Sequence, residues 1–133
     1  MSDPDQVSYF SRLDVEECWA LLSEAEVGRI AWRGPAGIVI VPVNFQLVGR
    51  TIVFHTVEGS GLAALADGAE VSFQVDEIDG ESAIGWSVLV QGRSGPAGGE
   101  ASSVSWLGDG VTVGVSVSPA AIDGRVVSGN KKS

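Results

Sequence analysis

The sequence predicts a small, mainly β-sheet domain, which is a β-barrel or sandwich with short helices packed against it. The chain contains about six short segments rich in β-branched and aromatic residues, with turn signals between them. Its 133 residues suit a single domain and favour one barrel. The strand pattern alone leaves three architectures open: an oligonucleotide-binding-type barrel, a lipocalin-like barrel and a split barrel.

The N-terminal region is expected to hold a loose arm over residues 1–12 and a helix over residues 13–22. Asp14 is a suitable N-cap for this helix, and Glu17, three positions later, completes a capping box. Apolar residues that include Cys18 recur at helical spacing. We therefore expect one face of the helix to be buried.

Six β-strands are expected after this helix. They cover residues 27–32, 38–47, 51–56, 69–78, 84–92 and 110–117. Only a short break at residues 48–50 separates the second strand from the third, which indicates a hairpin. A short helix over residues 62–66 follows a glycine-rich bend at residues 59–61. Residues 94–103 are rich in glycine, serine and alanine and are expected to be mobile, and residues 128–133 form a flexible tail.

Charge and composition exclude several classes of partner. Acidic residues number 17 against 8 basic ones, which gives a formal charge of −9 and a pI near 4.3. Such a charge repels phosphate backbones and anionic lipids, so neither nucleic acid nor a membrane is expected as a partner. No apolar run approaches the roughly 20 residues that cross a bilayer, and the acidic amino end does not resemble a secretory signal. Together with the single cysteine, these features predict a cytoplasmic protein.

Side-chain catalysis finds little support in the sequence. The single histidine, His55, and the single cysteine, Cys18, lie on different elements, and Cys18 belongs to the expected buried helix face. Metal-ligand spacings, a P-loop and a dinucleotide-binding fingerprint are all missing from the sequence. Asp76, Glu77 and Asp79 mark the end of a strand and are interpreted as a solvated rim. The sequence therefore assigns no catalytic residue and no metal site.

Several segments, in this order, resemble the pyridoxamine 5′-phosphate oxidase-like family of FMN-binding split barrels. They are residues 17–22 (ECWALL), 27–31 (VGRIA), 41–45 (VPVNF), 52–56 (IVFHT) with Gly59 and Ser60, 71–79 (VSFQVDEID), 85–92 (GWSVLVQG) and 118–125 (SPAAIDGR). The resemblance covers residues 13–127, and it implies a six-stranded split β-barrel with short flanking helices. It also implies a homodimer with FMN sites at the subunit interface.

The resemblance further implies where the cofactor lies. In relatives, the phosphate is held by an Arg or His followed by Thr, and by a Ser/Thr–Lys pair at the start of the next helix. The isoalloxazine ring lies against a Pro-Val-Asn strand. The cofactor contacts implied in this sequence are Val43, Asn44, His55, Thr56, Ser60, Gly61, Trp86 and Ser87. Gly61 stands where the family has its lysine, and this is the main departure from the pattern.

The same residues also have plainer interpretations. Residues 59–61 fit an ordinary loop, His55 a structural histidine, Asn44 a cap on a bulge and Trp86 barrel or interface packing. Losing one charge-assisted contact costs about 1.5–3 kcal/mol, or roughly a tenfold to hundredfold loss of affinity. An FMN site without the lysine is therefore weakened unless an arginine from elsewhere replaces it.

Two functions follow from these observations. The first is an FMN-dependent oxidoreductase that acts on a small organic substrate, with the flavin carrying the electron transfer. A deazaflavin in place of FMN is a variant of this function. The second is a non-catalytic, dimeric binding module that has weakened or lost FMN binding, and Gly61 favours it.

Overall fold

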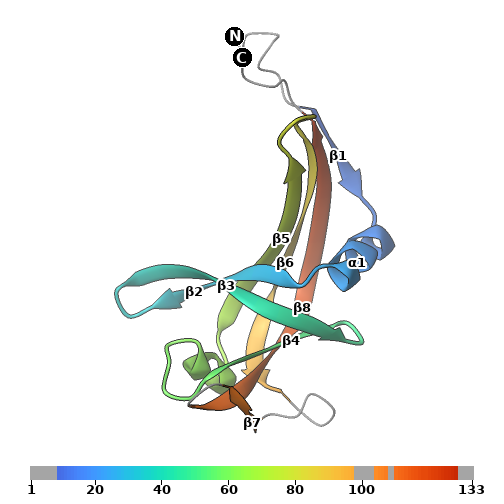
Figure 1. Ribbon diagram of the computed structural model, residues 1–133. Coiled ribbons are helices and arrows are strands. Elements are labelled where there is room, and N and C mark those ends of the chain that lie inside the picture. Colours follow the sequence, from blue (N-terminus) through green and yellow to red (C-terminus); the bar gives the residue numbers. More distant parts are fainter. Residues whose placement is uncertain (1–8, 98–103, 108–109, 129–133) are drawn as a thin grey trace.

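The computed structural model describes residues 9–97, 104–107 and 110–128. These residues form one α-helix, one short 3-10 helix and eight strands. In chain order they are β1 (Tyr9–Leu13), α1 (Val15–Glu24), β2 (Val27–Gly34), β3 (Gly37–Val48), β4 (Thr51–Val57), η2 (Ala63–Asp67), β5 (Glu70–Asp79), β6 (Ile84–Pro96), β7 (Val104–Leu107) and β8 (Gly110–Ser128). Antiparallel pairing joins the strands into one sheet, which confirms the mainly β fold (Figure 1).

Six of these strands close into a ring. Each pairs with the next in the order β8–β4–β3–β2–β5–β6, and β6 pairs back onto β8. β1 and β7 pair with β8 outside this ring. The expected six-stranded split barrel is therefore confirmed, and the two added strands account for the difference in strand count.

The last strand is longer than the strand pattern predicts. That pattern ends at residue 117, where serine and proline follow, whereas the family resemblance implies a closing strand over residues 118–125, and β8 runs through both segments to Ser128. Pro119 lies where the β6–β8 register shifts, opposite Gly92, so its missing N–H falls at an irregularity of the ladder. A side chain at Gly92 would collide with the backbone of Ser118, and the glycine therefore permits this close approach.

The N-terminal arm is shorter than expected. Residues 9–13 form β1, which pairs with the end of β8 from Tyr9 opposite Ser128 to Leu13 opposite Gly124. The partner of β1 is the end of β8, residues 124–128, beyond the strand that the pattern of residues predicts. Because a strand at an edge needs that neighbour for its hydrogen bonds, the expectation of a loose arm was wrong over residues 9–12.

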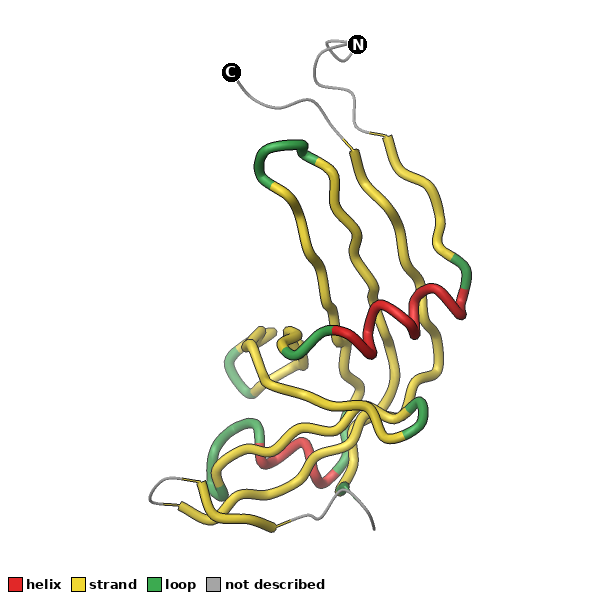
Figure 2. The backbone as a smooth tube through the Cα atoms, turned by 45° about the vertical axis from the view of Figure 1, so that its right-hand side comes forward, coloured by secondary structure: helices red, strands yellow, loops and turns green. Residues whose placement is uncertain are grey.

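The helix α1 begins and ends two residues later than expected, and its capping box is confirmed. The Asp14 carboxylate accepts the Glu17 N–H at 2.7 Å, and the Asp14 N–H donates to the Glu17 carboxylate at 3.1 Å. The buried face of the helix is formed by its residues Cys18, Trp19 and Leu22. Figure 2 shows α1 lying across strands that run side by side. Neither described helix is long and apolar enough to span a membrane.

Aromatic and β-branched side chains fill the barrel. Phe45 on β3 and Phe73 on β5 meet edge to face, with ring centroids 4.8 Å apart. Gly28 on β2 lies against the Phe73 ring so closely that a side chain at Gly28 would collide with it. Ile30 and Val88 are fully buried nearby in the same cluster. This packing fixes β2 and β3 on the core.

The β2–β3 hairpin extends beyond the core. Figure 1 shows it reaching to the left, away from α1 and β8. On β3, Ile38 and Ile40 are 69% and 63% exposed, whereas Val43 and Phe45 are 8% and 9% exposed. The hairpin therefore carries large apolar side chains that the described part of the chain leaves uncovered.

Candidate functional site

A cavity of about 650 Å³ lies between the β2–β3 hairpin and residues 60–69, and we refer to it as the hairpin cavity. Most of its lining is apolar. The larger apolar side chains are Trp32, Pro35, Val39, Val41, Leu62 and Leu65. Ser60, Gly61 and Arg33 also line it and supply polar groups. The hairpin cavity thus combines apolar walls with a polar edge.

The polar edge of the hairpin cavity is part of the expected phosphate loop. The hydroxyl oxygens of Thr56, at the end of β4, and Ser60 lie 3.0 Å apart. The Ser60 hydroxyl donates to the Val57 carbonyl at 2.7 Å and accepts the Ala63 N–H at 3.2 Å. Because a serine hydroxyl has a single proton, Thr56 is the donor in the contact with Ser60. These hydrogen bonds hold the bend in shape.

Gly61 lies at the open side of this bend. Apart from its chain neighbours, no heavy atom lies within 4 Å of the place that a Cβ would occupy. The N–H groups of Gly61 and Leu62 donate to no acceptor within the described residues, so they are available to an anion. Residues 56–62 contain no lysine or arginine, which leaves the bend without a fixed positive charge.

His55 lies apart from these hydroxyls. His55 directly precedes Thr56 on β4, and it pairs with Gly114 on β8. Successive side chains of a strand point to opposite faces, and Thr56 is buried whereas His55 is half-buried. The structure therefore brings together Thr56, Ser60 and Gly61, and it places His55 on the other face of β4. A phosphate contact of His55 stays a prediction.

Val43 and Asn44 lie further along β3, outside the lining of the hairpin cavity. Val43 is buried in the core opposite Gly28, and Asn44 is exposed opposite Val27. Their alternation lets only Asn44 face outward. Contacts of these two residues with a flavin ring stay predictions.

Trp86 and Ser87 line a different cavity, of about 420 Å³, which we call the β6 cavity. It is formed by β5, β6 and β8, and Gln74, Asp123 and Arg125 line it as well. The described residues of one chain therefore do not bring Trp86 and Ser87 into the same cavity as Ser60. Contacts of Trp86 and Ser87 with a flavin stay predictions.

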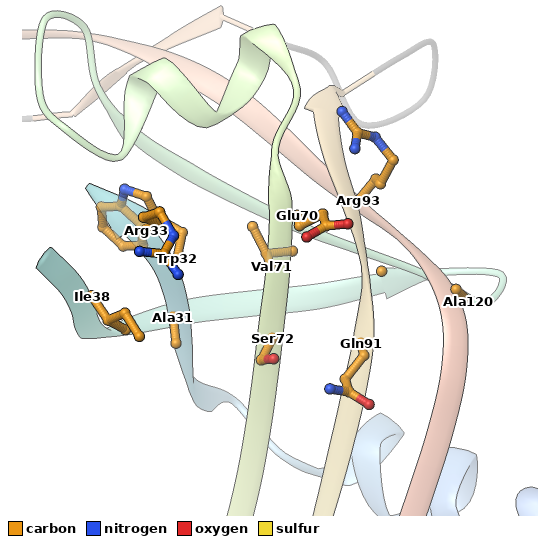
Figure 3. Close-up of a pocket in the computed structure, with 11 residues that line it drawn as sticks. Ala31, Trp32, Arg33, Ile38, Glu70, Val71, Ser72, Gln91, Arg93 and Ala120 are labelled. Carbon is orange, nitrogen blue, oxygen red and sulfur yellow. The ribbon is translucent and has the colours of Figure 1, made fainter. Parts of the chain in front are cut away.

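A third cavity, of about 570 Å³, lies on the outer face of the sheet, and we call it the outer-face cavity. Its polar side chains stand at alternate positions of neighbouring strands (Figure 3). They are Arg33 on β2, Glu70 and Ser72 on β5, and Gln91 and Arg93 on β6. Trp32 and Arg33 line both this cavity and the hairpin cavity.

Sequence reasoning does not assign Trp32 and Arg33 to a site. The available signal is their position, since both precede the turn signal at residues 34–37 and therefore lie near a hairpin tip. The spatial approach of that tip to residues 60–69 is a tertiary contact without a local sequence signature.

Cys18 is a packing residue, as the sequence predicts. It is 1% exposed. Burial, followed by the negative charges of Asp123, Asp14 and Glu17, raises the pKa of its thiol above the ordinary value. Because the thiolate is the nucleophilic form, this environment disfavours thiol catalysis.

The acids at the end of β5 have structural partners. Asp76 forms an ion pair with Arg29 at 3.4 Å. The Asp79 carboxylate accepts the Glu81 N–H at 3.0 Å, and this bond, with help from Ser82, lowers the pKa of Asp79. Among the residues that the structure describes, no three His, Cys, Asp or Glu side chains gather where they could hold a metal ion.

A ring of six strands closed by a long last strand defines the protein as a split barrel. Its sequence matches the pyridoxamine 5′-phosphate oxidase family over residues 14–103. The structure of a FAD binding protein from Mycobacterium smegmatis is 33% identical, with a TM-score of 0.73, and covers 89% of this chain and 98% of that chain. The chain therefore belongs to the pyridoxamine 5′-phosphate oxidase family.

Two further proteins are similar to this chain, the first in fold and the second in sequence. A FAD-binding protein from Mesorhizobium loti shares the fold at 20% identity, with a TM-score of 0.73 and coverage of 92% of this chain and 99% of that chain. An uncharacterized protein of Mycobacterium tuberculosis is 28% identical over an alignment of 96 residues, and the match covers 68% of this chain. The chain spans 63% of the length of that curated relative.

Proposed function

We propose that the protein binds a flavin in the hairpin cavity and serves as a flavin-dependent oxidoreductase acting on a small organic substrate. The observation that carries this proposal is the hairpin cavity, whose apolar walls lie beside a bend of hydroxyl and N–H groups. It occurs in a chain that belongs to the pyridoxamine 5′-phosphate oxidase family. Its volume of about 650 Å³ lies within the range of small-molecule sites, roughly 300–1,000 Å³. Such a cavity suits a flat apolar ring that carries an anionic tail.

The residues of the cavity fit the two ends of this ligand differently. Trp32, Val39 and Val41 form an apolar wall that would pack against a ring and keep water from it. The N–H groups of Gly61 and Leu62 are the donors that this cavity offers to a phosphate, and the Thr56 hydroxyl holds the Ser60 side chain in the bend. A bound flavin would supply the electron transfer, and the chain would position it and exclude solvent.

FMN is the flavin that the family resemblance implies, and FAD is the alternative because relatives from two organisms are FAD-binding proteins. The test is to purify the protein, record its visible spectrum, and identify any released cofactor by chromatography and mass spectrometry. We expect yellow protein with oxidised-flavin absorbance. Colourless protein that takes up neither FMN, FAD nor a deazaflavin would contradict the proposal.

A homodimer is part of the same proposal. Uncovered Ile38 and Ile40 support it, and so does the separation of Ser87 from Ser60 within one protomer. In this arrangement a second copy would bring its β6 cavity to the hairpin cavity of the first. Sedimentation at micromolar concentration tests it, and a monomer there would count against a shared site.

A non-catalytic dimeric binding module is the second candidate. Two observations favour it: residues 56–62 lack a fixed positive charge, and the Ser60 proton is committed to the Val57 carbonyl. A dimer that fails to take up FMN or FAD in a titration would support this candidate. Flavin uptake followed by reduction of the bound flavin would exclude it.

A further inference from the structure

We propose that Arg33 binds the phosphate of the flavin and supplies the positive charge that position 61 lacks. This inference rests on the proposed function, since it names a binding residue of the same site. It concerns a residue on β2, which is distant in sequence from the bend at residues 56–61.

The placement of the other arginines leaves Arg33 as the cation of this cavity. Three of them form ion pairs elsewhere, which are Arg12 with Asp123, Arg29 with Asp76 and Arg50 with Glu16. Arg125 lines the β6 cavity and Arg93 the outer-face cavity. Among the described residues, Arg33 is the arginine that lines the hairpin cavity together with Ser60 and Gly61.

The Arg33 guanidinium is also free to turn toward a ligand. Its side chain is exposed, and within the described residues it forms no ion pair, although Glu70 lines the outer-face cavity beside it. Arg33 stands at the boundary of the two cavities, because it lines both. A guanidinium binds phosphate through two parallel N–H bonds, which suits a rim position better than a point charge does.

The open space at Gly61 is consistent with N–H donors from the bend and a positive charge from β2. A lysine at position 61 would meet no atom at its Cβ, so its absence leaves the bend open toward the cavity. Arg33, on β2, lines the same cavity from the opposite wall, so a turn of its exposed side chain would bring the guanidinium to an anion held there. The chain thus presents donors from the bend and a cation from the hairpin to one anion.

The test compares FMN with riboflavin, which has the same ring and no phosphate, in fluorescence titrations of the full chain. For Arg33→Ala we expect a loss of FMN affinity of about tenfold to hundredfold, with riboflavin affinity unchanged. Arg33→Lys keeps the positive charge but loses the two parallel N–H bonds of a guanidinium, so its FMN affinity should lie between those of Arg33→Ala and the parent. Arg93→Ala is the matched control, since Arg93 is also exposed but lines only the outer-face cavity of the two. It should leave both affinities unchanged.

A second substitution keeps the test sharp. Gly61→Lys in the Arg33→Ala background should restore most of the lost FMN affinity, because the new ammonium would face the same phosphate. FAD titrated in parallel should follow FMN, since it also carries phosphate on the same side of the ring.

The titrations distinguish a wrong assignment of Arg33 from a lack of flavin binding. Equal losses of FMN and riboflavin affinity in Arg33→Ala, or no loss of either, would overturn this inference and leave flavin binding intact. An equal effect of Arg93→Ala on FMN would overturn it as a general charge effect. A parent protein that binds neither flavin would remove the proposed function and this inference together.

Discussion

The two halves of β3 differ in what covers them. Val43 and Phe45 lie in the barrel core and are almost fully buried, whereas Ile38 and Ile40, a few positions earlier on the same strand, are more than half exposed. The sequence separates the two halves, because residues 38–41 are a continuous β-branched run, whereas Asn44 and Gln46 alternate with apolar residues in the second half. Their neighbours differ as well, since the second half packs on β5 and α1 and the first half belongs to the projecting hairpin (Figure 1).

This difference bears on how many faces of a continuous apolar strand are expected to be buried. A run without polar alternation is typical of a strand buried on both faces. In this protomer the run at residues 38–41 is the wall of the hairpin cavity on one side and an uncovered surface on the other. The described residues thus cover one face of a run whose composition is typical of two covered faces.

The largest effect is expected from Phe45→Ala, in the covered half. It removes the edge-to-face contact with Phe73 and leaves a cavity in the core. We expect the free energy of unfolding to fall by about 3–5 kcal/mol, measured by urea denaturation. Ile40→Ala is the matched control in the uncovered half, where the change should stay within about 0.5 kcal/mol at protein concentrations low enough to separate subunits. Similar losses for both variants would end the distinction between the halves.

A smaller effect is expected from Gly28→Ala, at the cross-strand partner of Val43. The added methyl group would collide with the Phe73 ring, which is buried and cannot swing aside without disturbing Phe45. Overpacking of this kind typically costs about 1–3 kcal/mol of unfolding free energy. Gly61→Ala is the control, because its Cβ would meet open space. A stable Gly28→Ala protein would show that the core adjusts more freely than its packing indicates.

Local signals made most of the fold predictable from the sequence. The capping box of Asp14 and Glu17 located α1 within two residues, and β-branched runs located the strands of the ring. The strand pattern missed the continuity of β8 because Pro119 usually ends a strand, and only the glycine opposite it in β6 permits the bulge, whereas the family resemblance did indicate a closing strand over residues 118–125. Missing that continuity also hid β1.

The sequence placed Thr56, Ser60 and Gly61 at one bend, where the structure has Ser60 and Gly61 lining a cavity and Thr56 in contact with Ser60. Their contacts with a cofactor stay predictions. The sequence could not show that Arg33 lines the same cavity, because its place depends on how the hairpin approaches residues 60–69. It also could not show that Ser87 lies in another cavity, since that depends on the path of β6 along the barrel.

The smallest effect on folding, and the most informative for the comparison, is expected from Ile38→Ser combined with Ile40→Ser. Both side chains are exposed in the protomer, so their replacement should change its unfolding free energy by no more than about 0.5 kcal/mol. If the hairpin is covered by a second copy, the parent protein should become more stable as its concentration rises, and the double variant should lose this dependence and sediment as a monomer. Val15→Ser, at an exposed aliphatic residue of α1, is the control and should alter neither property. A double variant that still forms the parent's dimer would mean that the uncovered half of β3 does not make the interface.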